Sequence, residues 1–415
     1  MSDVPPRRDV RMHGFPSRTS VDQVSRLVRE LARALSAESV GLAEATGRVL
    51  AGEVVAPVAV PGFLRAAMDG YALRGEETFG ASDYNPLTFR LIGQAMPGRP
   101  FPGVVGRGQA VRIMTGAPVP PGADAVLMAE YAQESHDGTA VSVTESVPPG
   151  RHVGQVGEDI EAGQTLLGPG RVLRPQDVGV VASVGLASVS VVRRPRVRLV
   201  ITGDELLPPG SMPTGARIVD SNSVMLAGLV SRDGGSALCD PIVPDRREAV
   251  EAAILDPGGD LVLVSGGSSV GIEDHAPLIV AAHGELLVHG VAMRPSSPAG
   301  MGRIGNRLVF LLPGNPVSCL CAYEFFAGPA VRLLGGRSPA WPHRQVRARL
   351  ARKIASPAGR VDYVRVRLAE AGVEPVAVSG ASILSSTIRA DGFVIVSQDS
   401  EGHAPGEEVL VYLYE

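Results

Sequence analysis

Apolar and polar residues alternate with different periods along the chain, and each period predicts a different kind of element. Residues 20–36 carry apolar side chains on one helical face, at Val21, Val24, Leu27, Val28, Leu31 and Leu35. Thr19 or Ser20 can cap this helix. A second, short helix is predicted at 42–46, followed by a strand at 48–56.

Between residues 61 and 154 the chain becomes rich in Gly, Pro, Val and Thr, and short apolar runs alternate with turn residues. These runs predict strands at 87–93, 109–114, 125–129 and 139–143. A helix is predicted again at 174–184. The pattern indicates a small β unit inserted into an elongated helical segment.

From Pro195 onward, predicted strands alternate with predicted helices. The strands fall at 197–201, 236–241, 261–264, 286–291 and 308–312, and the helices at 223–232, 246–255, 276–282 and 317–334. Such alternation is typical of a parallel or mixed sheet covered by helices on both faces, a three-layer α/β domain. Beyond Gly335 only strands are predicted, at 346–353, 362–368, 393–396 and 408–413, so the chain ends in a small β domain.

Length and composition indicate a multidomain protein and give no support for a nucleic-acid-binding or membrane protein. The chain has 415 residues, too many for one ordinary domain, and 45% of them are hydrophobic. A net charge of −4 gives no support for general binding to nucleic acid or anionic membranes. No apolar run approaches the roughly 20 residues needed to cross a bilayer. The first 18 residues contain no apolar core, so we expect a disordered tail and not a signal peptide.

Cysteine usage indicates a reducing compartment. The chain has three cysteines, an odd and small number that argues against a disulfide framework and for the cytoplasm. Cys319 and Cys321 fall in a predicted helix, where residues two apart point in different directions. We therefore expect these two thiols to pack in the core instead of binding a metal.

The segment LVLVSGGSSVG (261–271) joins a buried strand to a glycine-rich turn, with Asp274 and a predicted helix behind it. A turn of this kind lets backbone N–H groups approach an anion at the start of a helix. Ser265, Gly266, Gly267, Ser268, Ser269 and Gly271 are the candidate phosphate-binding residues. The alternative is that Gly-Gly serves only to make the turn.

Two further strands end in similar turns, TGDEL (202–206) and LPGNPVS (312–318), the latter containing Pro313, Gly314, Asn315 and Pro316. In an open α/β sheet the carboxyl ends of the strands share one edge, where ligands bind. Convergence of three turns favours a shared ligand site over three separate helix entries.

Glu205, Asp245 and Asp274 are expected near the same edge. Taken singly, each carboxylate can serve as a helix cap. Carboxylates beside bound phosphates normally require a divalent cation, because like charges repel. Together the three residues predict a Mg²⁺-dependent site. The polar turns MDGYA (68–72) and RIMTGAP (112–118) cannot be placed relative to this site from the residues alone.

At this point the chain resembles a known family. MDGYA, RIMTGAP, GED (157–159), TGDEL, DSN (220–222), SGGSSVG with Asp274, and LPGNPVS match, in order, the motifs of the molybdopterin molybdenumtransferases. This is the MoeA family, which is related to the E domain of gephyrin. The resemblance extends from about Ser20 to the C-terminus.

The resemblance implies four domains: an elongated helical or mixed domain (19–60 and 155–193), an inserted β domain (61–154), a three-layer α/β molybdopterin-binding domain (194–337) and a C-terminal β-barrel (338–415). It also implies a homodimer. The active site would join the α/β domain of one subunit to the inserted β domain of the other, which would contribute Asp69, Thr115 and Asp159.

The implied reaction is insertion of molybdate into adenylylated molybdopterin, with Mg²⁺-dependent release of AMP. Asp69, Thr115, Glu205 and Asp274 would be catalytic, and Asp245, Asp274 and Glu205 would serve the metal. Asp220, Asn222, Arg294 and the LPGNP turn would bind substrate. The implied partners are an adenylyltransferase that supplies the pterin and molybdoenzyme acceptors, with no role for nucleic acid or membrane.

Two segments depart from the family pattern. The family usually has Lys-Pro-Gly-Lys-Pro where this chain has Arg294-Pro295-Ser296-Ser297-Pro298, so one cation is kept and Ser297 replaces the other. Before MDGYA the chain reads FLRAA (63–67), in which Arg65 could restore a charge. These departures indicate a divergent paralogue. A tungstate-handling enzyme and a non-catalytic pterin-binding scaffold remain alternatives.

Overall fold

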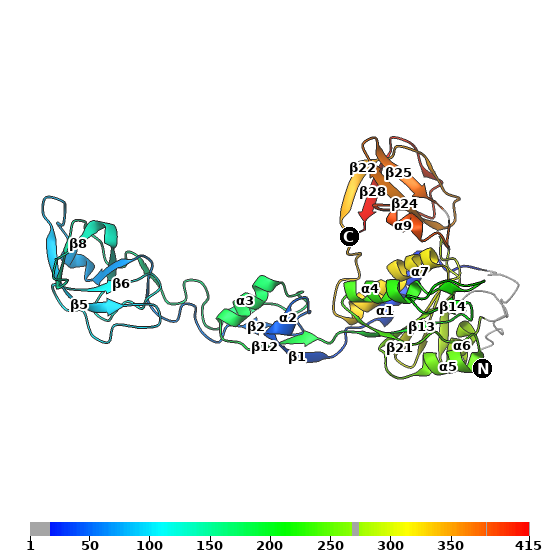
Figure 1. Cartoon of the computed structure of the whole chain (residues 1–415), viewed down its shortest axis with the longest axis horizontal. Helices are drawn as coiled ribbons and strands as arrows, with labels where there is room; N and C mark the ends of the chain where they lie inside the picture. Colours follow the sequence, from blue (N-terminus) through cyan, green and yellow to red (C-terminus); the bar gives the residue numbers. More distant parts are fainter. Residues whose placement is uncertain (1–16, 268–273, 379, 415) are drawn as a thin grey trace. The chain divides into compact units, whose positions relative to one another are not determined.

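Strand pairing builds three six-stranded sheets in the described part of the chain, residues 17–267, 274–378 and 380–414 of the computed structural model (Figure 1). The chain divides into two units. Unit 1 comprises the described parts of Met1–Ser39, Gly47–Ala51 and Ser190–Glu415, and unit 2 comprises Val40–Thr46 and Gly52–Val189. Strands β1 (Ala37–Gly41) and β12 (Ser188–Val192) run across the boundaries between the units.

The first sheet of unit 1 has the strand order β16-β13-β17-β21-β20-β18. Its strands are β13 (Arg196–Ile201), β16 (Ser236–Cys239), β17 (Leu261–Ser265), β18 (Glu285–His289), β20 (Gly300–Ile304) and β21 (Arg307–Leu312). The four strands from β16 to β21 are parallel, whereas β20 and β18 continue the sheet antiparallel. The sheet is therefore mixed.

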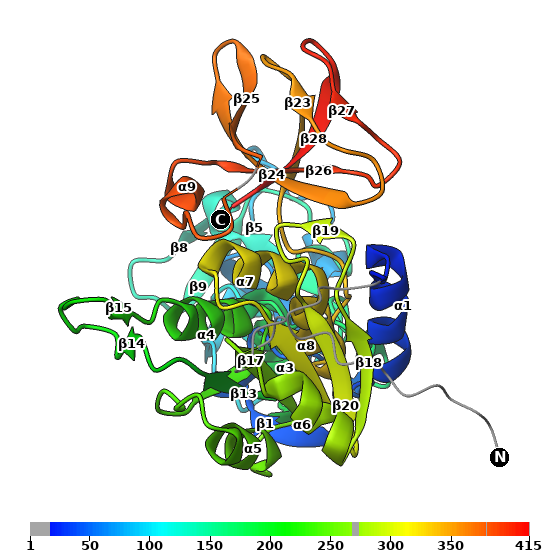
Figure 2. The ribbon, with the colours of Figure 1, turned by 90° about the vertical axis from the view of Figure 1, so that its right-hand side faces the viewer.

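Helices cover both faces of this sheet (Figure 2). On one face, Leu199 and Leu263 pack in a core with α4 (Asn222–Arg232) and the run α7 (Pro316–Ala322), η3 (Tyr323–Ala327) and α8 (Gly328–Leu334). On the other face, Val200 and Val262 pack with α5 (Arg247–Leu255) and α6 (Ala276–His283). Alternate residues of fully apolar strands thus feed two cores, which gives the three-layer arrangement that the alternating pattern predicts.

Strand β20 was not expected from the sequence. Its residues GMGRI lack the β-branched content of a typical strand. A Cβ at Gly302 would lie 2.4 Å from Val280 of α6 and 2.5 Å from the carbonyl oxygen of Glu285. Position 302 therefore requires glycine because α6 and the neighbouring strand approach it closely. The pattern of apolar and polar residues does not show this requirement.

The run Pro316–Leu334 is, by length and composition, able to span a membrane, with 19 residues and a mean hydropathy of 1.3. The prediction was that no apolar run approaches the length needed to cross a bilayer, and polar Ser318, Glu324 and Arg332 interrupt this one. However, 89% of its apolar window is buried inside the fold. It is the core helix of the α/β domain, and Cys319 and Cys321 are buried in it as free thiols, as expected.

The C-terminal sheet has the order β19-β24-β26-β28-β22, with β25 paired to β24. Its strands are β19 (Met293–Arg294), β22 (Gln345–Arg349), β24 (Val361–Ala369), β25 (Gly372–Ala377), β26 (Gly392–Val396) and β28 (Glu408–Leu413). The pair β23 (Ile354–Ala355) and β27 (Gly402–His403) and the helix α9 (Ser385–Ile388) complete this part. The path β25-β24-β26-β28-β22 has β25 and β22 as its edges, and these edges meet through a bridge between Leu350 and Val373 and a hydrogen bond from the Ala351 amide to the Val373 carbonyl oxygen at 2.8 Å. The sheet therefore curls round toward the barrel that was expected.

Helix α1 (Val21–Leu31) begins after Ser20, whose hydroxyl accepts a hydrogen bond from the Gln23 amide at 3.2 Å. Its apolar face, including Val24 and Val28, belongs to the same core as the α/β sheet. The expectation placed this helix in the elongated domain. The sequence of an amphipathic helix shows that one face is apolar, but it does not show which domain that face packs against. Here it packs against the α/β domain.

Unit 2 contains the third sheet, of order β7-β4-β6-β5-β9-β8. Its strands are β4 (Gly70–Leu73), β5 (Leu87–Ala95), β6 (Gln109–Ile113), β7 (Ala125–Met128), β8 (Ala132–Glu134) and β9 (Ala140–Val143). The remaining elements are α2 (Leu42–Ala45), α3 (Pro175–Ser183), η1 (Gly75–Thr78), η2 (Ala129–Tyr131) and the pairs β2 (Val54–Val55) with β11 (Thr165–Leu167) and β3 (Arg65–Ala66) with β10 (Val153–Gly154). The strand expected at 48–56 is thus divided into an antiparallel bridge between Leu50 and Val191 and the short strand β2.

Candidate functional site

The three turns at the carboxyl ends of β13, β17 and β21 line one cavity of about 500 Å³. A Cβ on Gly266, which has a φ of 99°, would lie 2.4 Å from the carbonyl oxygen of Thr202. The Cα of Gly266 also lies 3.6 Å from the Cβ position of Gly314. The turns TGDEL, SGG and LPGNP are therefore in van der Waals contact, and only glycine allows the central one to sit between the others.

Asn222 ties two of these turns together. Its side-chain amide donates to Ser265 Oγ at 2.9 Å and to the Gly314 carbonyl oxygen at 2.8 Å. Asp220 accepts from the backbone amides of Asn222 at 2.8 Å and Ser223 at 3.1 Å, the first two residues of α4. Both residues line the cavity, but these bonds hold the protein together. The substrate contacts expected of them remain predictions.

Glu205, Asp245 and Asp274 all line this cavity. The Asp245 carboxylate accepts a bond from the Asp204 amide at 3.3 Å, and the Asp245 amide donates to Asp204 at the same distance. Across the part of the chain that the structure describes, no three His, Cys, Asp or Glu side chains form a ready-made metal cluster. The Mg²⁺ site expected of these three carboxylates remains a prediction.

Polar atoms without a protein partner face this region. Among the described residues, Thr202 Oγ1 and Asn222 Oδ1 are buried and make no hydrogen bond. Buried polar groups are usually paired, so these two atoms are candidates for ligand contact. Ser268, Ser269 and Gly271 of the phosphate-binding turn lie outside the described residues.

The C-terminal domain contributes to the same cavity, which sequence analysis did not anticipate. Ser382 lines it and donates a hydrogen bond to Asn315 Oδ1 at 2.9 Å. The Val317 amide donates to the Ala381 carbonyl oxygen at 2.9 Å. The LPGNP turn is therefore held from both sides, by Asn222 of α4 and by residues 381–382.

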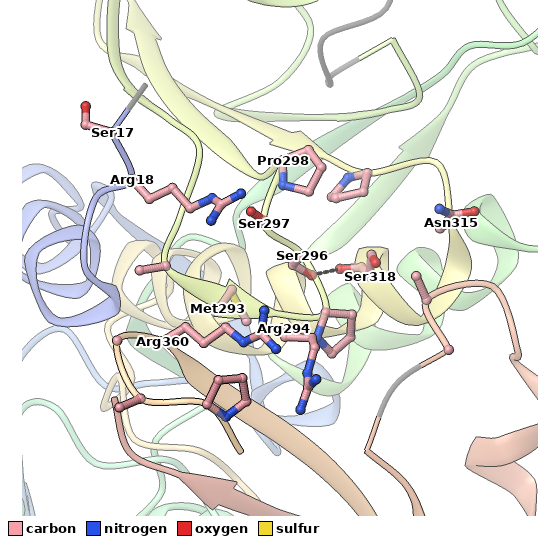
Figure 3. A pocket seen from close by; sticks show the side chains of 18 residues that line it. Ser17, Arg18, Met293, Arg294, Ser296, Ser297, Pro298, Asn315, Ser318 and Arg360 are labelled. Atoms are coloured by element: carbon pink, nitrogen blue, oxygen red, sulfur yellow. Dashed lines mark hydrogen bonds between the residues drawn. The ribbon is translucent and has the colours of Figure 1, made fainter. Parts of the chain in front are cut away.

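A second cavity of about 730 Å³ shares Pro298, Pro313 and Asn315 with the first. Three arginines line it: Arg18, Arg294 and Arg360 (Figure 3). No acidic side chain is among its described lining residues. Sequence analysis identified only Arg294, because Arg18 and Arg360 reach the cavity through tertiary packing. The cavity is suited to an anion.

Asp362 lies beneath this cavity, with its side chain fully buried. Its carboxylate pairs with Arg294 Nη2, lies 3.4 Å from Arg360 Nε and accepts a bond from Ser356 Oγ at 2.7 Å. The parallel pairing of β19 with β24 places Arg294 opposite Asp362 in the sheet. The two arginines are therefore fixed by one shared carboxylate.

The turn that departs from the family pattern contains a strained residue. Ser296 has a φ of 90°, a value that non-glycine residues rarely adopt. Glycine occupies this position in the family motif. The Ser296 hydroxyl donates to the Ser318 carbonyl oxygen (Figure 3), a bond that offsets part of the strain. The same turn places Pro298 and Ser297 in the second cavity.

In unit 2, MDGYA and RIMTGAP meet because β4 and β6 pair antiparallel, with Gly70 opposite Ile113. Thr115 donates its amide at 2.7 Å and its hydroxyl at 2.8 Å to Asp69 Oδ1. The bond from the Thr115 amide, followed by that from its hydroxyl, lowers the pKa of Asp69 below its ordinary value. Asp69 is thus an exposed carboxylate held in its ionised form.

Arg65 does not supply the free charge that was suggested for it. Its guanidinium donates to Glu158 Oε1 at 3.0 and 2.6 Å, so the positive charge is paired within unit 2. Asp159, the next residue, is exposed. The role expected of Asp159 in a partner's active site remains a prediction.

Comparison with known proteins bears on this arrangement. Residues 19–185 match the MoeA N-terminal region (domain I and II), residues 198–333 a probable molybdopterin binding domain, and residues 347–414 the MoeA C-terminal region (domain IV). Molybdopterin molybdenumtransferase 2 of Mycobacterium tuberculosis is 39% identical over 84% of this chain and 87% of its own length. The molybdopterin molybdenumtransferase of Haemophilus influenzae is 31% identical over 94% of this chain and 98% of its own.

Solved structures agree. Two crystal structures of the molybdopterin biosynthesis MoeA protein from Pyrococcus horikoshii superpose with TM-scores of 0.83 and 0.77, at 32% and 30% identity. Each covers 96% of this chain and 100% of its own. The fold and its turns thus define a multidomain protein of molybdopterin metabolism.

The chain belongs to the MoeA family, as its motifs indicated, and is a transferase of molybdenum cofactor biosynthesis.

Proposed function

We propose that this protein inserts molybdate into adenylylated molybdopterin and releases AMP. The observation that carries this proposal is the shared wall, formed by Pro298, Pro313 and Asn315, between a cavity lined by phosphate-type turns and a cavity lined by arginines. A pterin phosphate and a tetrahedral oxyanion are the two groups that must meet in this reaction. Holding them side by side lowers the entropic cost of bringing them together.

The first cavity would hold the pyrophosphate that is cleaved. The Gly266 amide donates to the Leu312 carbonyl oxygen at 3.3 Å, so the turn would offer the Gly267 amide to phosphate oxygens. Thr202 Oγ1 would be a further polar contact. Glu205, Asp245 and Asp274 would hold Mg²⁺, which when bound offsets negative charge on the phosphates. The contacts of Asn222 with Ser265 and Gly314 keep the two turns at a fixed separation.

The second cavity would hold the oxyanion. Arg294 and Arg360 carry planar guanidinium groups that donate paired hydrogen bonds to anionic oxygens. Their side chains are 26% and 33% exposed, so they are partly shielded from water yet open to the cavity. The lost family lysine at Ser297 does not leave the cavity without cations.

The active site is completed, in this proposal, by a second copy of the chain. The role of Asp69 and Thr115 follows from the family's dimer. An ionised Asp69 is suited to act as an acid–base or metal-directed group. An adenylyltransferase would supply the pterin, molybdoenzymes would accept the product, and both steps would take place in the cytoplasm.

The test is a reaction of the purified full-length protein with adenylylated molybdopterin, Mg²⁺ and molybdate, in which AMP is quantified. We expect AMP release that depends on molybdate. Release with tungstate alone would assign the chain to a tungstate-handling paralogue. Tight binding of the pterin without AMP release under either oxyanion would assign it to a scaffold, and in both cases the proposal is overturned.

A further inference from the structure

We propose that Arg18, in the segment before α1, is a third oxyanion-binding residue of the second cavity. The inference rests on the proposed function in one respect only, the assignment of this cavity to a tetrahedral dianion such as molybdate. Arg18 lies outside the motifs that carry the family resemblance. Figure 3 shows its guanidinium extending over the cavity toward Ser297, across from Arg294 and Arg360.

Backbone hydrogen bonds fix the position of Arg18. The Thr19 amide donates to the Gly290 carbonyl oxygen at 3.0 Å, and the Ala292 amide donates to the Thr19 carbonyl oxygen at 2.9 Å. The Val361 amide donates to the carbonyl oxygen of the same Ala292 at 2.9 Å. Three segments therefore meet at Ala292, and each carries an arginine within two residues of the junction.

Arg18 differs from the other two arginines of the cavity in how its charge is paired. Arg294 and Arg360 share the buried carboxylate of Asp362, so together these three residues carry one net positive charge. Within residues 17–267, 274–378 and 380–414, Arg18 takes part in no ion pair and no side-chain hydrogen bond, and it is exposed. Its charge raises the cavity to two net positive charges, which match a dianion.

Ser297 supplies an independent sign of a ligand at this position. Its hydroxyl oxygen is buried and has no hydrogen-bond partner among the described residues. A hydroxyl donor beside a guanidinium is a common pair of contacts for an anionic oxygen. The position at which the family motif has lysine thus holds a small donor here, and Arg18 brings the cation from another part of the chain.

The experiment is a calorimetric titration of the full-length protein with molybdate alone, and separately with inorganic phosphate, at low ionic strength. Three variants are compared: Arg18→Ala, Arg18→Lys and Arg26→Ala. Arg26 is an exposed arginine of α1 that does not line the cavity, so its loss changes the net charge equally. The cap of α1 is Ser20, which all variants keep. Thermal unfolding checks that each is folded.

We expect Arg18→Ala to raise the Kd for molybdate about tenfold, Arg18→Lys to recover part of this loss, and Arg26→Ala to leave the Kd unchanged. An equal change for phosphate supports a general dianion site, and a larger change for molybdate supports a selective one. Unchanged binding by Arg18→Ala, an equal loss in Arg26→Ala, or no molybdate binding by the wild type would overturn the proposal.

The outcome separates the two proposals. Molybdate binding that depends on Arg18, without AMP release in the full reaction, would leave the Arg18 assignment standing and remove the proposed function. AMP release that is unchanged in Arg18→Ala, with unchanged Kd and KM for molybdate, would remove Arg18 alone.

Discussion

Thr115 donates both its amide and its hydroxyl to one carboxylate oxygen of Asp69, at 2.7 and 2.8 Å. The two bonds favour the ionised form and lower the pKa of Asp69. Thr115→Ala removes the hydroxyl bond but keeps the amide bond. We therefore expect the pKa of Asp69 to rise part of the way toward its ordinary value, as followed by NMR titration of its carboxyl carbon.

The control for this change is Thr115→Ser, which keeps the hydroxyl and should keep the pKa of Asp69. If Asp69 acts as an ionised group in turnover, the acidic limb of the pH–rate profile moves to higher pH in Thr115→Ala only. Identical titration curves for the wild type and Thr115→Ala would show that the hydroxyl bond does not form in solution.

Asp274 lines the first cavity beside the turns that would hold phosphate. We expect Asp274→Ala, and equally Asp274→Asn, to reduce AMP release at least about 100-fold, because a carboxylate that holds the cation is lost. The elution volume in size-exclusion chromatography should not change. Wild-type rates of AMP release in both variants would refute the assigned role.

Gly266 lies between the TGDEL and LPGNP turns, which are too close together to leave room for a side chain. Gly266→Ala would place a Cβ 2.4 Å from the Thr202 carbonyl oxygen, at a φ of 99°. We expect a decrease of about 2–4 kcal/mol in the free energy of unfolding, from steric overlap and backbone strain together. Loss of pterin binding should accompany it, and denaturant titration measures the first effect.

Gly305→Ala is the matched control for Gly266→Ala. Gly305 has a φ of 58°, within the left-handed region open to other residues, and nothing lies within 4 Å of its Cβ position. Its substitution should cost about 1 kcal/mol and leave pterin binding intact. Equal losses of stability for the two variants would contradict the steric explanation.

Ser296 combines a strained φ of 90° with a hydroxyl bond to Ser318. Ser296→Ala keeps the strain and loses the bond, so we expect a loss of about 1 kcal/mol in stability. Ser296→Gly loses the bond but relieves the strain, and should be nearly neutral. Both are measured as shifts in the midpoint of urea unfolding. A larger loss in the glycine variant than in the alanine variant would contradict this balance.

Asp177 at the start of α3 accepts bonds from Arg174 and Arg171, and these bonds, with that from Arg174 the largest, hold its pKa well below the ordinary 3.8. Because the pKa of Asp177 is lower in the folded than in the unfolded protein, its charge stabilises the fold at pH values above the ordinary pKa. This stabilisation is lost as the pH falls from the ordinary pKa toward the folded-state pKa. Asp177→Asn should therefore lower stability by about 1–2 kcal/mol at pH 7.

The difference between the wild type and Asp177→Asn should shrink as the pH is lowered from about 5 to about 3. Thermal unfolding at several pH values measures it. A constant difference over this range would mean that the charge of Asp177 is not what stabilises the start of α3.

The convergence of the three turns could be predicted from the sequence, since each turn follows a strand whose apolar run places it in a parallel sheet. Periodicity alone therefore located Thr202, Gly266 and Gly314 at one edge. The same reasoning interpreted MDGYA as a turn, whereas Gly70–Leu73 is the buried strand β4. Four residues are too few to show the alternation of a strand, and Gly70 is a residue that strands usually lack.

Arg18, Arg360 and Ser382 could not be found in this way. Each lies in a short connecting segment without periodicity. Arg360 reaches the site through the pairing of β19 with β24, Arg18 through the bonds of Thr19 to the segment 290–292, and Ser382 through the bonds of residues 381–382 to Asn315 and Val317. Such contacts depend on tertiary packing between distant parts of the chain, and local propensity carries no signal for them.

The bond between Thr19 and Gly290 has a consequence for synthesis on the ribosome. All of unit 2 lies between these two residues in the sequence, so its sheet can fold while residue 290 has not yet been made. The segment carrying Arg18 and α1 is made before the α/β sheet, but it finds its binding partner only after that sheet has been translated. This segment is therefore among the last parts of the described chain to be fixed in place.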